Sequence, residues 1–485
     1  MNVPDLGTPS GLPIGAGWVA APDHADVVFP YTGEVVGRAP IADVELAGQA
    51  VDHALAVADA VAAAPSRVRR AVLMAVHQRL GAHRQEMEQL LVLETGKPVR
   101  DCRVEVARSL LTLETAAEEA SRVTGETVTL DGLAAGDGMV GFYLRVPIGV
   151  VVGIAGFNYP LLLAAHKIAP ALAAACPVVC KPAPQTPLST LVFVHWLREA
   201  AAEHGLPEAA VQLVTGDARV GARLTTDRRI GAVSFTGSAA VGHAIARDAA
   251  PTKTLLELGS NAAMVVAADA DLDRAVEAVA KGGYYASGQA CISVQRVLVE
   301  EPVHQQFVDR LRSRVEKVVV GDPRDEATEV SALIDAGSTR RVREWVDGAV
   351  AAGARVVAGD PGGDGGETLG PVVLGDVPDG EPLWDEEVFG PVVCVRAVPD
   401  VAEAFTEVNR SRYGLHASVW TASLETAFDA VRTLQVGGVI VNEVPGFRAD
   451  TMPYGGVKDS GVGREGPRFA IDELTVTRMA VIRPS

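Results

Sequence analysis

Apolar residues recur at helical spacing between about residues 43 and 122. The segments with this period are ADVELAGQAVDHALAVADAVAAA, RRAVLMAVHQRLGAHRQEMEQLLVLETG and DCRVEVARSLLTLETAAEEASRV. Capping preferences predict that helices begin at Asp43 and Asp101 and that the second helix ends at Gly96. The pattern therefore predicts a helical layer near the N-terminus.

The pattern then changes to short apolar runs that alternate with helical segments. The predicted strands are FYLRVP, GVVVGIAG, PVVCKP, AVQLVTG and IGAVSFTG. The predicted helices between them are LLLAAHKIAPALAAA, TLVFVHWLREAAAEHG, ARVGARLTTD and AAVGHAIARDAA. Strands that alternate with helices predict a parallel sheet with right-handed crossovers, the doubly wound architecture of nucleotide-binding domains.

A second α/β series begins near residue 257 and continues to about residue 450. Within it, PGGDGGETLGP has the composition of a surface loop. The terminal segment AIDELTVTRMAVIRPS ends in an alternating strand, which we expect to pair with FYLRVP or with another subunit. A chain of 485 residues is long enough for two or three domains.

Composition narrows the range of partners. The chain has 43 basic and 61 acidic residues, so its formal net charge is −18. Such a charge repels polyphosphates, and we expect neither nucleic acid nor a membrane surface as a partner. No apolar run approaches a membrane span and the N-terminus lacks a targeting pattern, so we expect a cytoplasmic protein. Cys176 and Cys180 have no histidine at ligand spacing, and we expect no metal site.

Three polar residues stand where chemistry is feasible, although each has an ordinary structural explanation. Cys291 lies in GQACISV, but a free cysteine is usually a small buried hydrophobe. Asn158 follows an apolar strand, where its amide can bind an oxyanion or merely form a turn before Pro160. Glu257 ends a strand in LLELGSNA, where burial would raise its pKa toward that of a general base, unless it binds backbone amides.

The cofactor signal is weak when it is taken from single motifs. FTGSAAVG has its glycines, Gly237 and Gly242, at a G-x4-G spacing, and no G-x-G-x-x-G occurs in this region. Ser238 and the free N–H groups of the following helix could still hold a pyrophosphate. Lys181, at the end of PVVCKP, could reach a ribose or a phosphate, or simply be solvated.

Taken together and in order, the motifs resemble the aldehyde dehydrogenase superfamily over nearly the whole chain. They are FNYP, KPAPQTPLS, FTGSAAVG, ELGSNA, GQACIS, EEVFGPV, YGLHASVW and MPYGGVKDSGVGREG. The pattern is most similar to members that oxidise phosphonoacetaldehyde or lactaldehyde. The resemblance implies an α/β fold with a Rossmann-type cofactor domain, a catalytic domain and a small β oligomerisation element. Their expected bounds are 1–125 with 147–256, 257–452, and 126–146 with 466–485.

The resemblance also implies roles for individual residues. Cys291 would attack the aldehyde, Asn158 and the Cys291 N–H would stabilise the oxyanion, and Glu257 would activate water against the thioester. The expected cofactor residues are Lys181 at the adenosine ribose, Ser238 at the pyrophosphate, Glu387 at the nicotinamide ribose with Phe389 beside it, and Gly237, Gly216 and Phe157 nearby. NAD is the expected cofactor, with Asp217 as weak support. Because Pro184 stands where many members have an acidic residue, NADP is the alternative.

The substrate is expected to be a short anionic aldehyde, such as phosphonoacetaldehyde or a semialdehyde. The residues that suggest it are Arg108, Lys167 and Arg448, which the resemblance places at the mouth of the aldehyde tunnel. Alternatively, the two arginines pair with nearby acids such as Asp450 and Glu105, and the substrate is neutral or resembles lactaldehyde. The presence of Glu257 argues against a CoA-acylating enzyme, and the complete catalytic set argues against a silent nucleotide-binding protein. We expect a homodimer or homotetramer.

Overall fold

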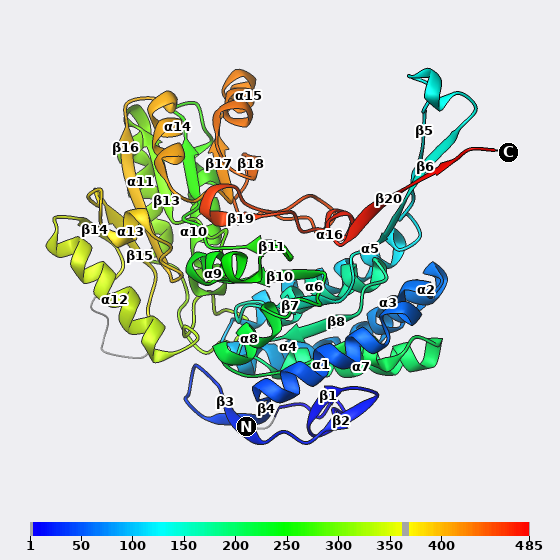
Figure 1. Ribbon diagram of the computed structural model, residues 1–485. Coiled ribbons are helices and arrows are strands. Elements are labelled where there is room, and N and C mark those ends of the chain that lie inside the picture. Colours follow the sequence, from blue (N-terminus) through cyan, green and yellow to red (C-terminus); the bar gives the residue numbers. More distant parts are fainter. Residues whose placement is uncertain (1–2, 361–367, 485) are drawn as a thin grey trace.

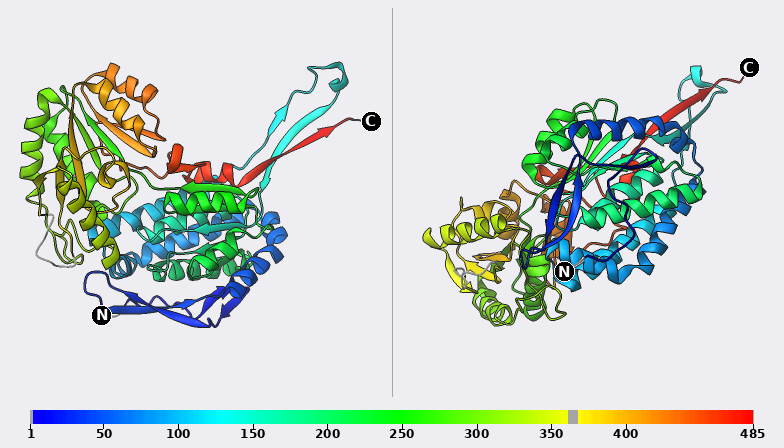
Figure 2. Two further views of the ribbon diagram at one scale, coloured as in Figure 1. Left: turned by 60° about the vertical axis from the view of Figure 1, so that its left-hand side comes forward. Right: turned by 90° about the horizontal axis from the view of Figure 1, so that it is seen from below.

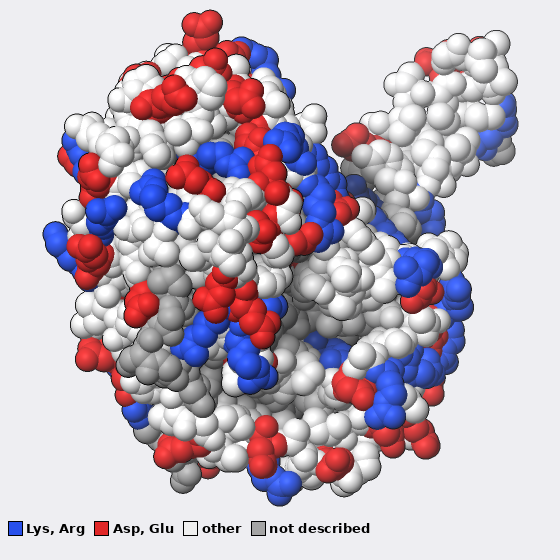
Figure 3. All heavy atoms as spheres, turned by 90° about the vertical axis from the view of Figure 1, so that its left-hand side faces the viewer, with Lys and Arg blue, Asp and Glu red and all other residues white. Residues whose placement is uncertain are grey.

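The computed structural model describes residues 3–360 and 368–484. Two α/β lobes, each built on its own sheet, lie side by side, and a long β arm projects from the first lobe (Figures 1 and 2). This arrangement confirms the predicted fold class. On the face shown in Figure 3, acidic and basic side chains are interspersed. No helix in the described part of the chain is both long and apolar enough to cross a membrane.

The first lobe contains a six-stranded sheet. Its strands in spatial order are β19 (Gly461–Val462), β11 (Lys253–Glu257), β10 (Ala232–Thr236), β7 (Val151–Ile154), β8 (Val178–Lys181) and β9 (Val211–Leu213). Neighbours are parallel except for β11 and β19. The chain runs outward from β7 on one side and from β10 on the other. The strand order therefore reverses between β7 and β10, where ligands bind in open α/β sheets.

Helices cover both faces of this sheet. They are α1 (Val44–Ala56), α2 (Ala58–Ala63), α3 (Ser66–Ala82), α4 (Arg84–Thr95), α5 (Val99–Glu119), α6 (Pro160–Ala173), α7 (Leu188–His204), α8 (Ala218–Thr225) and α9 (Ala239–Ala249). As predicted, Asp43 caps α1, and Gly96 ends α4 with a left-handed φ of +71°. The predicted helix start at Asp101 is wrong by two residues. Pro98 precedes the first turn of α5, and the buried Asp101 side chain bonds to another segment.

The second lobe contains a seven-stranded sheet. Its strands in spatial order are β14 (Arg355–Ala358), β15 (Val372–Gly375), β16 (Val392–Val398), β13 (Arg296–Glu300), β12 (Ala263–Val266), β17 (His416–Trp420) and β18 (Gly438–Val441). Its helices are α10 (Leu272–Tyr284), α11 (Glu301–Val315), α12 (Ala336–Ala351), α13 (Pro382–Asp385), α14 (Val401–Arg410) and α15 (Leu424–Thr433). Most of the loop predicted at PGGDGGETLGP lies outside the described residues.

The arm is a three-stranded antiparallel sheet. Its strands are β5 (Glu126–Val128), β6 (Val140–Pro147) and β20 (Thr475–Ile482), with Met479 opposite Tyr143. The predicted pairing of the terminal strand with FYLRVP is therefore confirmed. A helix, α16 (Pro467–Glu473), precedes β20 and packs against the first lobe rather than in the arm.

The strands before residue 43 are not among the predicted elements. They are β1 (Leu12–Ile14), β2 (Gly17–Val19), β3 (Asp23–Val28) and β4 (Val35–Ile41). They form two hairpins, and most residues of β2 and β3 are at least partly exposed. Short strands with little buried surface leave a weak period-two signal, because the alternation reflects burial of one face.

Candidate active site

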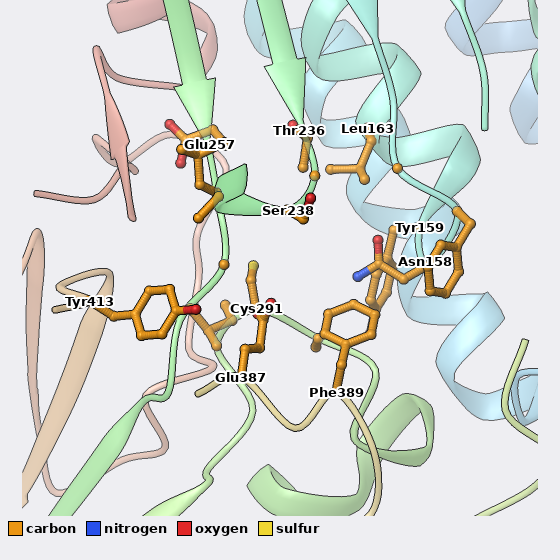
Figure 4. Close-up of a pocket in the computed structure, with 18 of the residues that line it drawn as sticks. Asn158, Tyr159, Leu163, Thr236, Ser238, Glu257, Cys291, Glu387, Phe389 and Tyr413 are labelled. Atoms are coloured by element: carbon orange, nitrogen blue, oxygen red, sulfur yellow. The ribbon is translucent and has the colours of Figure 1, made fainter. Parts of the chain in front are cut away.

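One cavity of about 450 Å³ lies where the carboxyl ends of β7, β10 and β11 face the second lobe. It is large enough for a small molecule. Both lobes line it, and Cys291, Asn158 and Glu257 are among the lining residues. Figure 4 shows the Cys291 sulfur near the centre, with the Asn158 amide nitrogen turned towards it and the Glu257 carboxylate turned away. The structure thus brings together the three residues predicted for catalysis.

Cys291 follows a turn that is held in an unusual backbone conformation. Residues 286–288 have φ of +49°, +56° and +74°, in the left-handed region. Such backbone is costly for non-glycine residues and persists where the surroundings impose it. Here the Asp101 carboxylate accepts the Ala286 N–H at 2.8 Å. A Cβ on Gly288 would lie 2.1 Å from a backbone carbonyl oxygen, so this position requires glycine.

The Cys291 thiol differs from the other four in the chain. It is partly exposed, whereas the other cysteines are buried. Its sulfur lies 3.1 Å from the Tyr454 hydroxyl. Burial raises the pKa of the Cys291 thiol to about 12, although the hydrogen bond with Tyr454 lowers it. A partly exposed thiol at a cavity can be reached by a ligand, as a reactive cysteine must be.

The Asn158 amide is held in position by its neighbours. Its Nδ2 donates to the Gln289 carbonyl at 2.8 Å, which leaves its second N–H for another acceptor. Asn158 lies just before α6, whose first turn is capped by a buried carboxylate. Glu105 accepts the N–H groups of Leu161 and Leu162 and also pairs with Lys97. The amide is therefore supported by a fixed helix terminus.

Glu257 ends β11 and is 5% exposed. Its Oε2 has no hydrogen-bond partner among the described residues. Burial and the charge of Glu465 raise the pKa of Glu257 well above its usual value, and Lys167 and Arg448 oppose that rise. A carboxyl group with a raised pKa and a free oxygen can act as a general base.

The cofactor residues predicted nearest the cavity do line it. Ser238 is the N-cap residue of α9, and its side chain makes no capping hydrogen bond. Glu387 accepts the Ser260 N–H at 3.0 Å, and burial raises its pKa to about 7. The rings of Phe157 and Phe389 meet edge to face at 5.6 Å. Also at this cavity is Gly237, where a Cβ would lie 2.5 Å from the Phe235 ring.

The two remaining predicted cofactor residues lie beyond the described lining of this cavity, at β8 and α8. Burial lowers the pKa of Lys181 to about 8, and the charge of Asp217 opposes this shift. Gly216 has a φ of +139° just before α8. Asp217 caps α8 through the N–H groups of the next turn and pairs with Arg219. Its carboxylate is therefore already engaged within its own helix.

The predicted substrate cations separate into two groups. Arg108 and Arg448 line the cavity, and so does His166. Behind them, the Asp450 carboxylate receives two hydrogen bonds from Arg108, at 2.8 and 3.0 Å, and lies 3.1 Å from His166. Arg448 pairs with Asp450 at 3.4 Å and with Glu465 at 3.2 Å. The alternative pairing of the arginines with acids is therefore present for Asp450, although both arginines also line the cavity.

Lys167 does not belong to this lining as far as the structure is described. Its Cβ packs against Gly153 of β7, and its ammonium group bonds to Thr236 and pairs with Glu465. It is 1% exposed. Its contacts are those of a buried ion pair behind Glu257, so its prediction as a substrate contact finds no support in the geometry.

A sequence model of the Aldehyde dehydrogenase family matches residues 18–480. The chain belongs to the aldehyde dehydrogenase family. Among curated relatives of this aldehyde dehydrogenase, 3-sulfolactaldehyde dehydrogenase from Priestia aryabhattai is 38% identical over 97% of this chain and 98% of its own. Lactaldehyde dehydrogenase from Methanococcus aeolicus is 34% identical over 96% of this chain and 98% of its own.

Solved structures of other aldehyde dehydrogenases are also similar. Aldehyde dehydrogenase 21 from Physcomitrella patens, in complex with the product succinate, has a TM-score of 0.93 and 37% identity, covering 97% of both chains. Glyceraldehyde-3-phosphate dehydrogenase from Methanocaldococcus jannaschii, complexed with NADP, has a TM-score of 0.90 and 32% identity, and the match covers 95% of this chain and 99% of its own. Betaine aldehyde dehydrogenase from Staphylococcus aureus, in complex with NAD+, has a TM-score of 0.92 and 28% identity, and the match covers 99% of this chain and 95% of its own. The chain is therefore an NAD(P)-dependent aldehyde dehydrogenase.

Sequence reasoning missed several residues at the aldehyde dehydrogenase site. Tyr454 stands in the quoted motif MPYGGVKDSGVGREG, but its contact with the nucleophile depends on how a distant loop folds back. Glu465, in the same motif, carries no signal of its ion pairs with Lys167 and Arg448. Asp101 has the sequence context of a helix cap, which gives no signal of its bond to the turn before Cys291.

Proposed function

We propose that this enzyme oxidises a short aldehyde with an anionic group to the carboxylate, through a thioester on Cys291. The observation that carries the proposal is that a partly exposed thiol, an amide donor and a buried carboxyl group with a free oxygen share one cavity. The guanidinium groups of Arg108 and Arg448 at the same cavity support the anionic substrate.

The side chains suit two successive steps at one carbon atom. The Cys291 thiolate attacks the aldehyde carbonyl, and the second N–H of Asn158 and the Cys291 N–H stabilise the oxyanion that develops. No acceptor for that backbone N–H is present within residues 3–360 and 368–484. Glu257, when ionised, removes a proton from the water that attacks the thioester. A turn of its side chain towards Cys291 must precede this step, since the carboxylate points away (Figure 4).

The residues present fit a nicotinamide dinucleotide. The N-terminus of α9 offers N–H groups to a pyrophosphate, and the Ser238 hydroxyl beside them makes no capping bond. The residues that we propose to hold the cofactor are Gly237, Ser238, Phe157, Glu387 and Phe389 at the cavity, with Lys181 and Gly216 at the adenosine end. NAD(P), when bound, supplies the hydride acceptor that converts the thiohemiacetal into the thioester.

Charge supports an anionic substrate. Behind the cavity, Arg108 and Arg448 pair with Asp450, and Arg448 also pairs with Glu465. Arg108 and Arg448 are among the arginines that line the cavity, whereas Asp450 and Glu465 are not part of the described lining. A guanidinium group can bind a phosphonate, sulfonate or carboxylate through paired hydrogen bonds, so arginines in the lining favour an anionic substrate. A relative named 3-sulfolactaldehyde dehydrogenase fits this class, and a lactaldehyde-type substrate is the second candidate because relatives with that name match as fully.

The arm supports self-association. Apolar side chains are exposed along β6 and β20 of the arm: Val140, Leu144, Val476, Met479, Val481 and Ile482. An exposed apolar strand surface is normally covered by a partner. We propose that residues 126–146 and 466–485, as one element, join two or four copies of the chain.

We also propose that 1–125 with 147–256 bind the cofactor and that 257–452 form the catalytic domain, as the two sheets suggest.

Initial rates with each cofactor test this function, followed by the absorbance of the reduced nicotinamide. Phosphonoacetaldehyde and succinic semialdehyde should give kcat/KM values roughly ten- to a hundredfold above those of propanal and benzaldehyde. Cys291→Ser should lose at least about three orders of magnitude of activity while cofactor binding persists. A preference for neutral aldehydes contradicts the anionic substrate, and turnover by Cys291→Ser contradicts the covalent route.

A further inference from the structure

The Tyr454 hydroxyl touches the proposed nucleophile. Its oxygen lies 3.1 Å from the Cys291 sulfur, although the two residues are 163 positions apart. The Tyr454 side chain is 3% exposed, so the contact is made away from bulk water. Neither the cofactor residues nor the oxyanion donors described above account for it.

The Tyr454 ring is fixed from two sides. The Arg448 guanidinium lies 3.7 Å from the ring centroid, over its face. The His416 ring meets it edge to face, with 5.0 Å between the centroids. His416 is itself held by the Pro445 carbonyl at 2.9 Å. A hydroxyl placed so firmly at a sulfur atom is a preorganised donor.

We propose that Tyr454 is a further catalytic residue, whose hydroxyl donates a hydrogen bond to the Cys291 sulfur and stabilises the attacking thiolate. This inference rests on the proposed role of Cys291. When the thiol ionises, its proton passes to a water molecule of the open cavity, and Tyr454 keeps its own proton. Either atom can donate while the thiol is protonated, but a thiolate can only accept, so the Tyr454 hydroxyl is then the donor.

The surroundings explain why the thiolate needs this donor. Burial is the main cause that raises the pKa of the Cys291 thiol, and the charges of Glu387 and Glu257 add to it. Arg448 and the Tyr454 hydrogen bond act in the opposite direction. The titratable and charged groups that interact electrostatically with the sulfur are Glu257, Glu387, Arg448, Tyr285 and Tyr454. Two acids therefore disfavour the thiolate, and the nearest neutral donor favours it.

Tyr454 itself remains a donor throughout. Burial and the neighbouring thiol raise the pKa of Tyr454 well above its usual value, so the phenol does not ionise in its place. The guanidinium of Arg448 over the ring face draws electron density from the phenol and makes its hydroxyl a stronger donor.

Thiol reactivity tests the proposal without requiring turnover. The rate of Cys291 alkylation by iodoacetamide is measured against pH in the intact enzyme, with mass spectrometry to locate the label. Tyr454→Phe keeps the ring and its contacts with Arg448 and His416 but removes the hydroxyl. Its alkylation rate at fixed pH should be about ten- to a hundredfold lower, because a hydrogen bond to a charged acceptor shifts the thiol equilibrium by that much.

Tyr285→Phe is the matched control. Tyr285 lines the same cavity, and its hydroxyl has no hydrogen-bond partner in the described structure. Its removal should leave the alkylation rate within about twofold of wild type. Tyr454→3-fluorotyrosine keeps the hydroxyl and acidifies it, so it should raise the rate at a given pH, and it serves even if Tyr454→Phe folds poorly.

Wild-type alkylation profiles in the Tyr454 variants would overturn the proposal and leave Tyr454 a packing residue. An equal loss in Tyr285→Phe would overturn it too, because the effect would then belong to the cavity as a whole. The proposed function fails separately, if Cys291→Ser retains turnover. An inactive Cys291→Ser beside a Tyr454→Phe with unchanged thiol reactivity refutes only the role of Tyr454.

Discussion

Replacing Glu257 by glutamine separates the two halves of the proposed reaction. The substitution keeps the shape of the side chain and removes its ability to accept a proton. The carboxyl group makes no hydrogen bond through Oε2 in the described structure. Because the proposed role of Glu257 begins only after the thioester has formed, thioester formation should proceed in the variant. Hydrolysis of the thioester, which needs an activated water, should not.

The size of the expected loss in hydrolysis rate follows from the proposed role of Glu257 as a general base. General-base catalysis contributes roughly a hundred- to ten-thousandfold, and burial raises the pKa of Glu257 above its usual value, as a general base at neutral pH requires. The variant should therefore release about one reduced nicotinamide per active site in a rapid phase, followed by a steady rate at least about a hundredfold below wild type. In the wild type, the hydrolytic step should accelerate with rising pH up to that raised pKa, since only the ionised carboxylate accepts a proton. The variant should lose this dependence.

Stopped-flow absorbance of the reduced cofactor measures the rapid phase, and mass spectrometry of the quenched enzyme measures the acyl group on Cys291. Glu387→Gln is the control, because it changes another buried carboxyl group at the cavity, on the proposed cofactor side. That variant should raise KM for the cofactor and show no stalled acyl-enzyme. Absence of the rapid phase in Glu257→Gln would mean that Glu257 acts before the thioester. Persistent turnover would mean that it is not the base.

Three further outcomes are expected. Arg108→Met should lower kcat/KM for anionic aldehydes by about ten- to a hundredfold and spare neutral ones, and an equal loss for both classes would refute the anion contact. Because burial lowers the pKa of Lys181 to about 8, KM for the cofactor should rise as pH increases through that value and Lys181 loses its charge; a flat profile there would count against its role. Asp101→Ala leaves the Ala286 N–H without an acceptor, which should cost about 1–3 kcal/mol, lower the thermal midpoint and slow Cys291 alkylation. An unchanged midpoint and alkylation rate would contradict this account of the turn.

Periodicity alone predicted most of the architecture. The alternation of apolar runs with helical segments located β7, β8, β9 and β10 and the helices between them, because buried parallel strands are continuous apolar runs. The same signal fails for the N-terminal hairpins and for β19, whose two residues form an antiparallel edge beside β11. A two-residue strand has no period, and only the tertiary structure pairs it.

The catalytic residues could be predicted from the sequence because the motifs occur in a recognisable order. The contacts that position these residues could not be predicted. The left-handed turn before Cys291 depends on Asp101, which is 185 residues before Ala286 and which local rules assign to a helix start. The contact between Tyr454 and the sulfur likewise joins two loops from different parts of the chain. Side chains that meet only after folding leave no local pattern, so propensity and spacing cannot predict such contacts.

The charged residues behind the cavity show where this limit matters for function. His166 and Lys167 are adjacent in sequence, yet the first lines the cavity and the second reaches Thr236 and Glu465. Adjacent positions of a helix point about 100° apart, so a basic pair on one helix cannot be assigned to one ligand. The same ion pairs that withdraw Lys167 from the substrate also set the electrostatics of Glu257, since Lys167 opposes the rise of its pKa and Glu465 promotes it. Substitution of Lys167 should therefore alter thioester hydrolysis rather than discrimination between anionic and neutral aldehydes.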